Sequence, residues 1–169
     1  MTEGIQLRDA RPGDEPAIRA LTLAAYAEYA QIMAPSAWEG LHHAVLGGLD
    51  QAQSAERIVA ERAGALIGSV MVFPPSLEGS AGAGGRMVWP ELRLLAVAPA
   101  ERGHGLGGAL VDACLERARA AGAPALGLYS SASLRAAIRM YQRKGFERAP
   151  EYDFQPPGAE LIMAFRKAL

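Results

Sequence analysis

The sequence predicts a mixed α/β fold in which helices cover both faces of a central sheet. Three observations predict it. Strand-like runs at 57–61 and 66–73 flank Ala63-Gly64, a pattern typical of an antiparallel hairpin. Between residues 87 and 129 a strand, an amphipathic helix and another strand follow one another, which indicates a β–α–β unit with parallel strands. A further helix and two strands complete the chain, so the sheet is expected to be mixed.

The first elements are a strand and two helices. Ile5 to Arg8 alternates like a half-buried strand, and Asp14 is expected to cap the helix that follows. Pro35 ends this segment. A second helix is predicted from about 36 to 46, ended by Gly47-Gly48.

The middle of the chain carries the β–α–β unit. The strand at 87–97 is apolar, and Pro90 predicts an irregular start. The helix from 105 to 121 places Cys114 on its apolar face, which favours a core thiol over a nucleophile. The Pro/Gly/Ser-rich run from 74 to 85 is expected to be a mobile loop that could gate a site; a hairpin insertion with no role is the alternative.

The C-terminal elements are a helix and two strands. Ser131 or Ser133 is expected to cap a helix from 134 to 144, and Gly145 to end it. The final strands are predicted near 146–152 and 161–165.

Composition limits the classes of function. The chain of 169 residues, 50% hydrophobic and 21% charged, fits one domain over residues 1–169. A net charge of −1 argues against nucleic acid or an anionic membrane surface as partner. A lone cysteine excludes an intramolecular disulfide, and we see neither a signal-like start nor an apolar run long enough to span a bilayer. A cytoplasmic protein is therefore expected.

The glycine-rich stretch from Arg102 to Gly108 predicts a pyrophosphate cradle. Glycine lets backbone N–H groups approach a phosphate, and the following helix adds its unpaired first-turn donors. The spacing also satisfies the dinucleotide pattern G-x-G-x-x-G. A Rossmann fold is disfavoured because four residues separate strand and glycines, no acidic residue ends the strand near Tyr129, and only about 40 residues remain for a second half. The lack of a Gly-Lys-Ser/Thr sequence excludes a Walker loop.

At this point the chain resembles the GNAT N-acetyltransferase superfamily in two motifs. The acyl-CoA signature of that family, a strand ending in Val and then x-Pro-x-x-Arg-Gly-x-Gly-x-Gly, is matched from Val97 to Gly107. The second motif, with an alanine, a hydrophobic–Tyr pair and Gly-Phe, is matched from Ala137 to Phe146. The resemblance implies a mainly antiparallel sheet of about six to seven strands with a splayed parallel pair that binds acyl-CoA.

The resemblance also implies a donor site for acetyl-CoA. Main-chain groups of Leu95 and Val97 would bind the pantetheine, and the Leu95 N–H would polarise the thioester carbonyl, a contribution of ~10²–10³ in rate. The full set of residues implied to bind acetyl-CoA is Leu95, Ala96, Val97, Arg102, Gly103, His104, Gly105, Leu106, Gly107, Gly108, Ser133 and Ala137.

Two side chains are candidates for proton transfer. Glu91, six residues before Val97, has the spacing of the catalytic glutamate of histone-type relatives; the alternative is an ion pair with Arg93 or Arg86. Tyr141 corresponds to the tyrosine that protonates the leaving thiolate in many relatives; the alternative is a core tyrosine. No cysteine lies near either motif to carry the acetyl group, so direct attack in a ternary complex is expected.

The acceptor stays open at this stage. Tyr26, Tyr29 and Trp38 lie where relatives place acceptor-binding helices, although core packing explains the tyrosines equally well. A small-molecule amine or an amino acid is favoured over a protein N-terminus or lysine, and a CoA-binding module without catalysis is the alternative from another class. Homodimerisation is undecided, and His42 and His43 lack partners for a metal site. Arg135, Arg139 and Arg143 form a basic stripe that either meets the CoA 3′-phosphate or is simply solvated.

Overall fold

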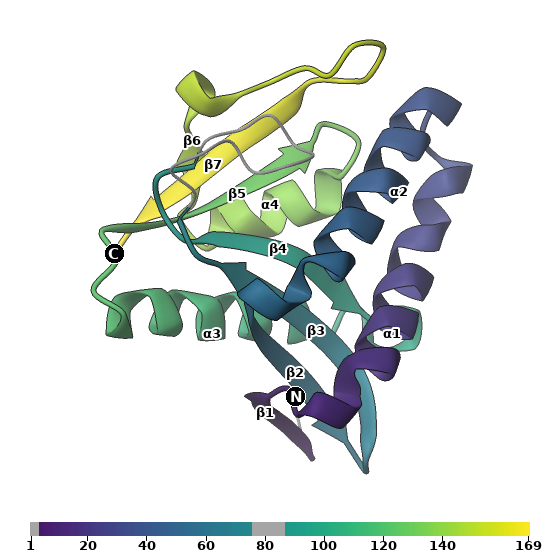
Figure 1. Ribbon diagram of the computed structural model, residues 1–169, viewed down its shortest axis with the longest axis vertical. Coiled ribbons are helices and arrows are strands. Elements are labelled where there is room, and N and C mark those ends of the chain that lie inside the picture. The colour runs from purple at the N-terminus through teal and green to yellow at the C-terminus, as the bar shows by residue number, and fades with distance from the viewer. Residues whose placement is uncertain (1–3, 76–86) are drawn as a thin grey trace.

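A computed structural model describes residues 4–75 and 87–169 and shows one mixed sheet with helices on both faces (Figure 1). The strand order is β1-β2-β3-β4-β5-β7-β6. Neighbours in this sheet are antiparallel except for β4 and β5, which are parallel. The predicted fold class is therefore confirmed. The strands are β1 (Ile5–Asp9), β2 (Glu56–Arg62), β3 (Ala65–Phe73), β4 (Glu91–Val97), β5 (Ala125–Ser131), β6 (Glu147–Arg148) and β7 (Ile162–Ala168).

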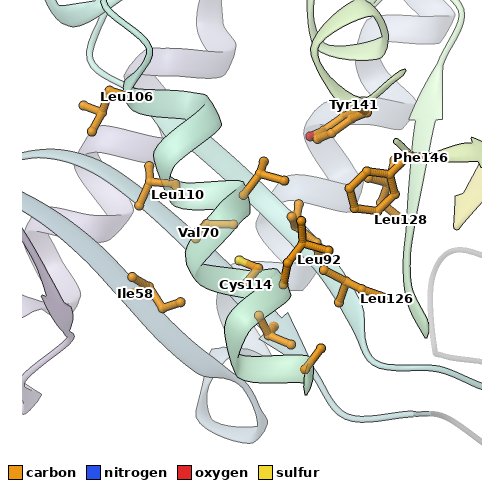
Figure 2. Packing of buried hydrophobic residues seen from close by; sticks show 14 of the residues in the cluster. Ile58, Val70, Leu92, Leu106, Leu110, Cys114, Leu126, Leu128, Tyr141 and Phe146 are labelled. Atoms are coloured by element: carbon orange, nitrogen blue, oxygen red, sulfur yellow. The ribbon is translucent and has the colours of Figure 1, made fainter. Parts of the chain in front are cut away.

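Each face of the sheet has its own core. The helices α1 (Glu15–Ala27) and α2 (Pro35–Asp50) cover one face, where Ile18, Val45 and Phe73 are buried together. On the other face lie α3 (Leu106–Ala120) and α4 (Arg135–Arg143). Figure 2 shows the larger core there, in which side chains of α3 pack on alternate residues of β2 to β5. The alternation follows from the two-residue period of strands, which sends neighbouring side chains to opposite faces.

The hairpin and the β–α–β unit form as predicted. Ala63 and Gly64 both have positive φ, 50° and 82°, as a two-residue hairpin turn requires. Cys114 is fully buried, and burial raises the pKa of its thiol to about 12, so it is a core residue as expected.

Helix α2 runs past the two glycines that were expected to end it. Its hydrogen bonding continues to Gln51, whose N–H donates to the Gly47 carbonyl at 3.1 Å. Gly48 is instead a close-approach residue, because a Cβ there would lie 3.0 Å from Cδ1 of Leu94 on β4. A glycine ends a helix where it adopts the left-handed conformation that turns the chain out of the helix.

The predicted helix caps are also wrong, because the side chains expected to cap bond other groups. Asp14 makes no side-chain cap to α1; its carboxylate accepts from the Arg11 N–H at 2.7 Å and from Arg8 at 2.6 Å. Ser131 and Ser133 donate to the Glu160 carboxylate at 2.6 and 2.8 Å, and α4 has no side-chain cap. Only the serines exchange a local cap for a partner far along the chain.

The end of α4 and the last strands agree only in part with the prediction. Gly145 has φ +85°, and the Phe146 N–H donates to the Tyr141 carbonyl at 3.0 Å, so glycine ends the helix as expected. The strand predicted at 146–152 is only two residues long. Pro150, which lacks an N–H, starts a 3-10 turn instead.

Two further expectations concern the membrane and the loop from 74 to 85. Within residues 4–75 and 87–169, no helix combines the length and the apolar character that crossing a bilayer demands. Most of the loop that could gate a site, namely 76–86, lies outside the described residues.

Candidate active site

A fork between β4 and β5 is the central feature of the site. The two strands pair only at Glu91 with Gly127 and at Leu92 with Leu128. The Gly127 N–H also donates to the Pro90 carbonyl at 2.9 Å, at the closed end of the fork. Beyond Leu92 the strands separate, which is the splayed parallel pair expected from the resemblance.

A β-bulge at Leu94 bends β4 away from β5. Against β3, the register passes from Arg93 opposite Met71 to Ala96 opposite Ser69, so β4 has one residue more than β3 in this interval. Leu94 has φ +54°, a conformation that L residues adopt at a cost of roughly 1–2 kcal/mol. Contact with Gly48 of α2 holds its side chain in this position.

The bulged strand directs two N–H groups into the fork. The Ala98 N–H donates to the Ile67 carbonyl of β3 at 2.9 Å. Because successive N–H groups of a strand point to opposite edges, those of Val97 and Leu95 point toward β5. Both residues line the cavity described below. They lie where the sequence predicted the main-chain contacts to pantetheine.

The fork opens into a cavity of about 730 Å³ between α1, α3, α4 and the two strands. Its size is that of a typical small-molecule site. The predicted donor-binding and catalytic residues in its lining are Leu95, Val97, Arg102, Gly103, Gly105, Leu106, Gly107, Gly108, Ala137 and Tyr141. Predicted residues outside the lining are Glu91, Ala96, His104 and Ser133.

The glycine loop leaves open space in front of its backbone. Gly103 and Gly105 have φ of 81° and 82°, and no atom lies within 4 Å of a Cβ built on either. Gly107 and Gly108 instead face α4: a Cβ on Gly108 would lie 3.2 Å from Lys144. The loop therefore needs glycine for two reasons, left-handed backbone at its start and close helix packing at its end.

The cations that line the cavity are Arg93, described below with Glu91, and Arg102, Arg143 and Lys144. Arg102 is held by α1, because its guanidinium forms an ion pair with Glu28 and donates to the Ala25 carbonyl at 2.9 Å. Lys144 pairs with Asp112 of α3 at 2.5 Å. The sequence pointed to the arginine stripe and missed Lys144, although its place just before Gly145 could have shown that it faces the loop.

Tyr141 lines the cavity and is largely buried. It is 7% exposed, and its ring packs against Phe146 with centroids 5.8 Å apart. The hydroxyl points away from Phe146 (Figure 2). Burial, and to a lesser degree the nearby Tyr26, raises the pKa of Tyr141 strongly. The phenol is therefore protonated at neutral pH and can donate a proton.

Glu91 lies at the closed end of the fork, with a side chain 7% exposed. Its two oxygens accept from Nε and Nη2 of Arg93, each at 2.7 Å. Burial raises the pKa of Glu91, and the hydrogen bonds from Arg93 oppose this rise. The ion pair named as an alternative is thus present, and the base role stays a prediction.

Of the three residues expected to bind the acceptor, two line the cavity and one does not. Tyr26 and Tyr29 line the cavity with ring centroids 5.9 Å apart, and burial raises the pKa of both phenols. Trp38 lies outside the lining and stacks on His42 at 5.1 Å. Within the described residues, no group of three or more His, Cys, Asp or Glu side chains could hold a metal ion.

Sequence reasoning missed two lining residues on β5. Tyr129 and Ser130 both have buried hydroxyls for which residues 4–75 and 87–169 supply no hydrogen-bond partner. Arg93, considered only as a partner of Glu91, also lines the cavity. The signal available in the sequence was their place beside the parallel strand pair, but the residue at which the strands separate is not encoded by any motif.

Comparison with known proteins gives one family. The acetyltransferase (GNAT) family matches residues 23–146. A mycothiol acetyltransferase of Thermobispora bispora is 34% identical over 156 residues, which cover 88% of this chain and 48% of that protein. The chain therefore spans about half the length of this curated relative.

Solved structures give the same result. A GNAT family acetyltransferase of Brucella melitensis, in complex with acetyl-CoA, is 26% identical, with a TM-score of 0.63 over 98% of this chain and 88% of the other. A ribosomal-protein-alanine N-acetyltransferase of the same organism is 25% identical, with a TM-score of 0.65 over 97% and 99%.

Proposed function

Because this chain belongs to the GNAT acetyltransferase family, we propose that it transfers the acetyl group of acetyl-CoA to a primary amine of a small molecule or an amino acid. The observation that carries the proposal is the fork, whose unpaired strand edge leads through one cavity to the glycine loop. We also propose that residues 1–169 act as one catalytic domain.

The donor site fits acetyl-CoA at both ends. The edge of β4 beyond Leu92 offers N–H and C=O groups to an extended pantetheine chain, which would pair as an added strand does. The open space before Gly103 and Gly105, the N-terminal turn of α3 and the nearby Arg143 suit a diphosphate. When bound, acetyl-CoA supplies an activated acetyl thioester.

Three groups of the chain are assigned to the reaction: the Leu95 N–H, the Tyr141 hydroxyl and the Glu91 carboxylate. The Leu95 N–H, directed into the fork, would donate to the thioester oxygen as negative charge grows there. Tyr141 would give its proton to the departing sulfur, a role supported by its protonated state and its place in the cavity. The thiolate that would otherwise leave is thereby neutralised.

The attacking amine must first lose a proton, because a lysine-like ammonium has a pKa of about 10.4. Glu91 is the proposed acceptor of that proton. Its carboxylate lies outside the cavity lining and is paired with Arg93, so transfer would pass through a water molecule. A raised pKa makes a carboxylate a stronger base, which supports the assignment.

Attack is proposed to be direct. Cys114 is the one cysteine of the chain. It is fully buried on the core face of α3, and the pKa of its thiol is raised to about 12. It therefore offers no thiolate to carry the acetyl group.

The acceptor could also be a protein N-terminus or a lysine. Two of the three relatives named above refer to different molecules, mycothiol and an alanine of a ribosomal protein, so likeness to them does not choose between the classes. A CoA-binding module without catalysis is the remaining alternative.

One experiment tests the proposal. Calorimetry should show acetyl-CoA binding, and release of free thiol from acetyl-CoA should depend on an added amine from a panel of small amines, amino acids and peptides. Acetyl-CoA binding with no thiol release for any amine would favour the binding module. Failure to bind acetyl-CoA would contradict the proposal as a whole.

A further inference from the structure

Arg93 and Tyr129 are the first residues of their strands beyond the point where β4 and β5 cease to pair. They follow Leu92 and Leu128, the last pair in register. Those two leucines pack in the core beneath α3, so the next residue on each strand points to the opposite face, that of α1 and α2. Both Arg93 and Tyr129 line the cavity.

The Arg93 side chain is held in one position and its charge is balanced. Its Nε and Nη2 donate to Glu91, and its guanidinium lies over the Phe73 ring at 4.5 Å from the centroid. Its remaining nitrogen, Nη1, makes no hydrogen bond to another described residue. A fixed, charge-balanced guanidinium thus presents unused N–H donors to the cavity wall.

The Tyr129 hydroxyl is buried and has no hydrogen-bond partner among the residues that the structure describes. Its ring is fixed edge-on against Phe154 at 5.2 Å. Burial, followed by the charge of Glu91, raises its pKa to about 12, while Arg93 lowers it. The hydroxyl is therefore a neutral donor, close enough to the ion pair to feel both charges. Buried polar groups without partners are rare in native proteins, so the hydroxyl of a residue that lines the cavity is a candidate to bond a ligand group.

We propose that Arg93 and Tyr129 together bind a neutral oxygen of the acceptor, the carbonyl of an amide attached to the carbon that bears the amine. This inference rests on the proposed acetyltransferase function and names its acceptor class, α-amino amides, which include peptide N-termini. Arg93 lies two residues before Leu95, with the bulge residue Leu94 between them, and all three line the same cavity.

Charge decides between an amide and a free carboxylate. The Glu91 carboxylate already neutralises Arg93. The carboxylate of a free amino acid placed beside this pair would therefore be repelled by Glu91 without gaining an unpaired charge on Arg93. A carbonyl oxygen accepts from the same donors without that repulsion. The acceptor site is therefore expected to prefer α-amino amides to the matching free amino acids.

The first test compares matched acceptors. With rates expressed per concentration of free-base amine, kcat/KM for L-alaninamide should exceed that for L-alanine by about tenfold, the value of one hydrogen bond or charge contact. Panels of other amide and acid pairs should show the same order. Equal or reversed preference across the panel would overturn the inference, while acetylation of the amines would still support the proposed function.

The second test removes the hydroxyl. Tyr129→Phe should raise KM for L-alaninamide about tenfold, leave the Kd of acetyl-CoA unchanged and not lower Tm, because the hydroxyl has no partner to lose in the free protein. Tyr152→Phe, the same change at a neighbouring tyrosine outside the cavity lining, is the control. A lowered Tm with unchanged KM would show a structural role and contradict the inference.

The third test unbalances the charge. Glu91→Gln leaves Arg93 as an uncompensated cation, so the preference for L-alaninamide over L-alanine should fall at least about tenfold. The ratio of the kcat/KM values for the two acceptors cancels effects that are common to both, including the loss of a base. Calorimetry with L-alaninamide and with L-alanine, each on the CoA-saturated protein, measures the same preference without turnover, so an inactive variant is still informative.

Discussion

The two ends of the cavity are built from different parts of the chain. The end proposed to bind the donor is made largely of backbone: the edge of β4, the glycine loop and the first turn of α3. The end proposed to bind the acceptor is made of side chains, among them Tyr26 of α1, Arg93 of β4 and Tyr129 of β5. Backbone geometry depends on a few glycines at fixed spacing, whereas a side-chain surface can change residue by residue while the fold is retained. The first end is thus suited to one constant ligand and the second to a variable one.

The largest effect is expected at the boundary between the two ends. Tyr141→Phe should lower kcat about 10²-fold, because the sulfur would leave without its proton donor, with little change in the Kd of acetyl-CoA. Steady-state kinetics and calorimetry measure the two quantities, and Tyr152→Phe is the matched control. Unchanged kcat would remove Tyr141 from the reaction and leave it a core tyrosine.

The donor end should respond to a change in backbone freedom. Gly105→Ala forces a left-handed residue with a Cβ, so the loop should lose its shape and the Kd of acetyl-CoA should rise about tenfold, with KM for the amine little affected. Gly13→Ala is the control, since Gly13 has no positive φ and space for a Cβ. An equal rise for both variants, or a larger effect on the amine, would contradict the division of the cavity.

The pH dependence of the reaction tests Glu91. If it accepts the ammonium proton, kcat/KM should rise with pH through a pKa above the ordinary value of a glutamate, because burial favours the protonated form. In Glu91→Gln that limb of the profile should be lost. A wild-type profile in the variant would leave Glu91 only as the partner of Arg93.

The smallest effect is expected away from both ends. Hydrogen bonding to Arg8 lowers the pKa of Asp14 to about 2, so Asp14 stabilises the folded state above its unfolded pKa of 3.8, and this stability is lost as the pH falls toward 2. Asp14→Asn should lower Tm slightly at neutral pH, since exposed ion pairs contribute about 0–1 kcal/mol. The difference from wild type should vanish near pH 2, with activity at neutral pH unchanged. A growing difference at low pH would contradict the assigned direction.

The comparison of the two ends also explains what the sequence could predict. The glycine spacing and the Ala137–Phe146 motif were sufficient for the family and the fold class, because both record backbone requirements. The bulge at Leu94 was not predictable, since a leucine with positive φ depends on its contact with Gly48, 46 positions away in the chain. Tyr129 was missed for a similar reason: its role depends on which residue of β4 is the last to pair.

Gly48 joins the packing of α2 to the bulge in β4. Because it has no Cβ, α2 can lie against the side chain of Leu94, the residue at which β4 turns away from β5. A larger residue at position 48 would have to displace that leucine side chain. The shape of the fork is therefore constrained by a residue of α2, a helix outside the cavity lining.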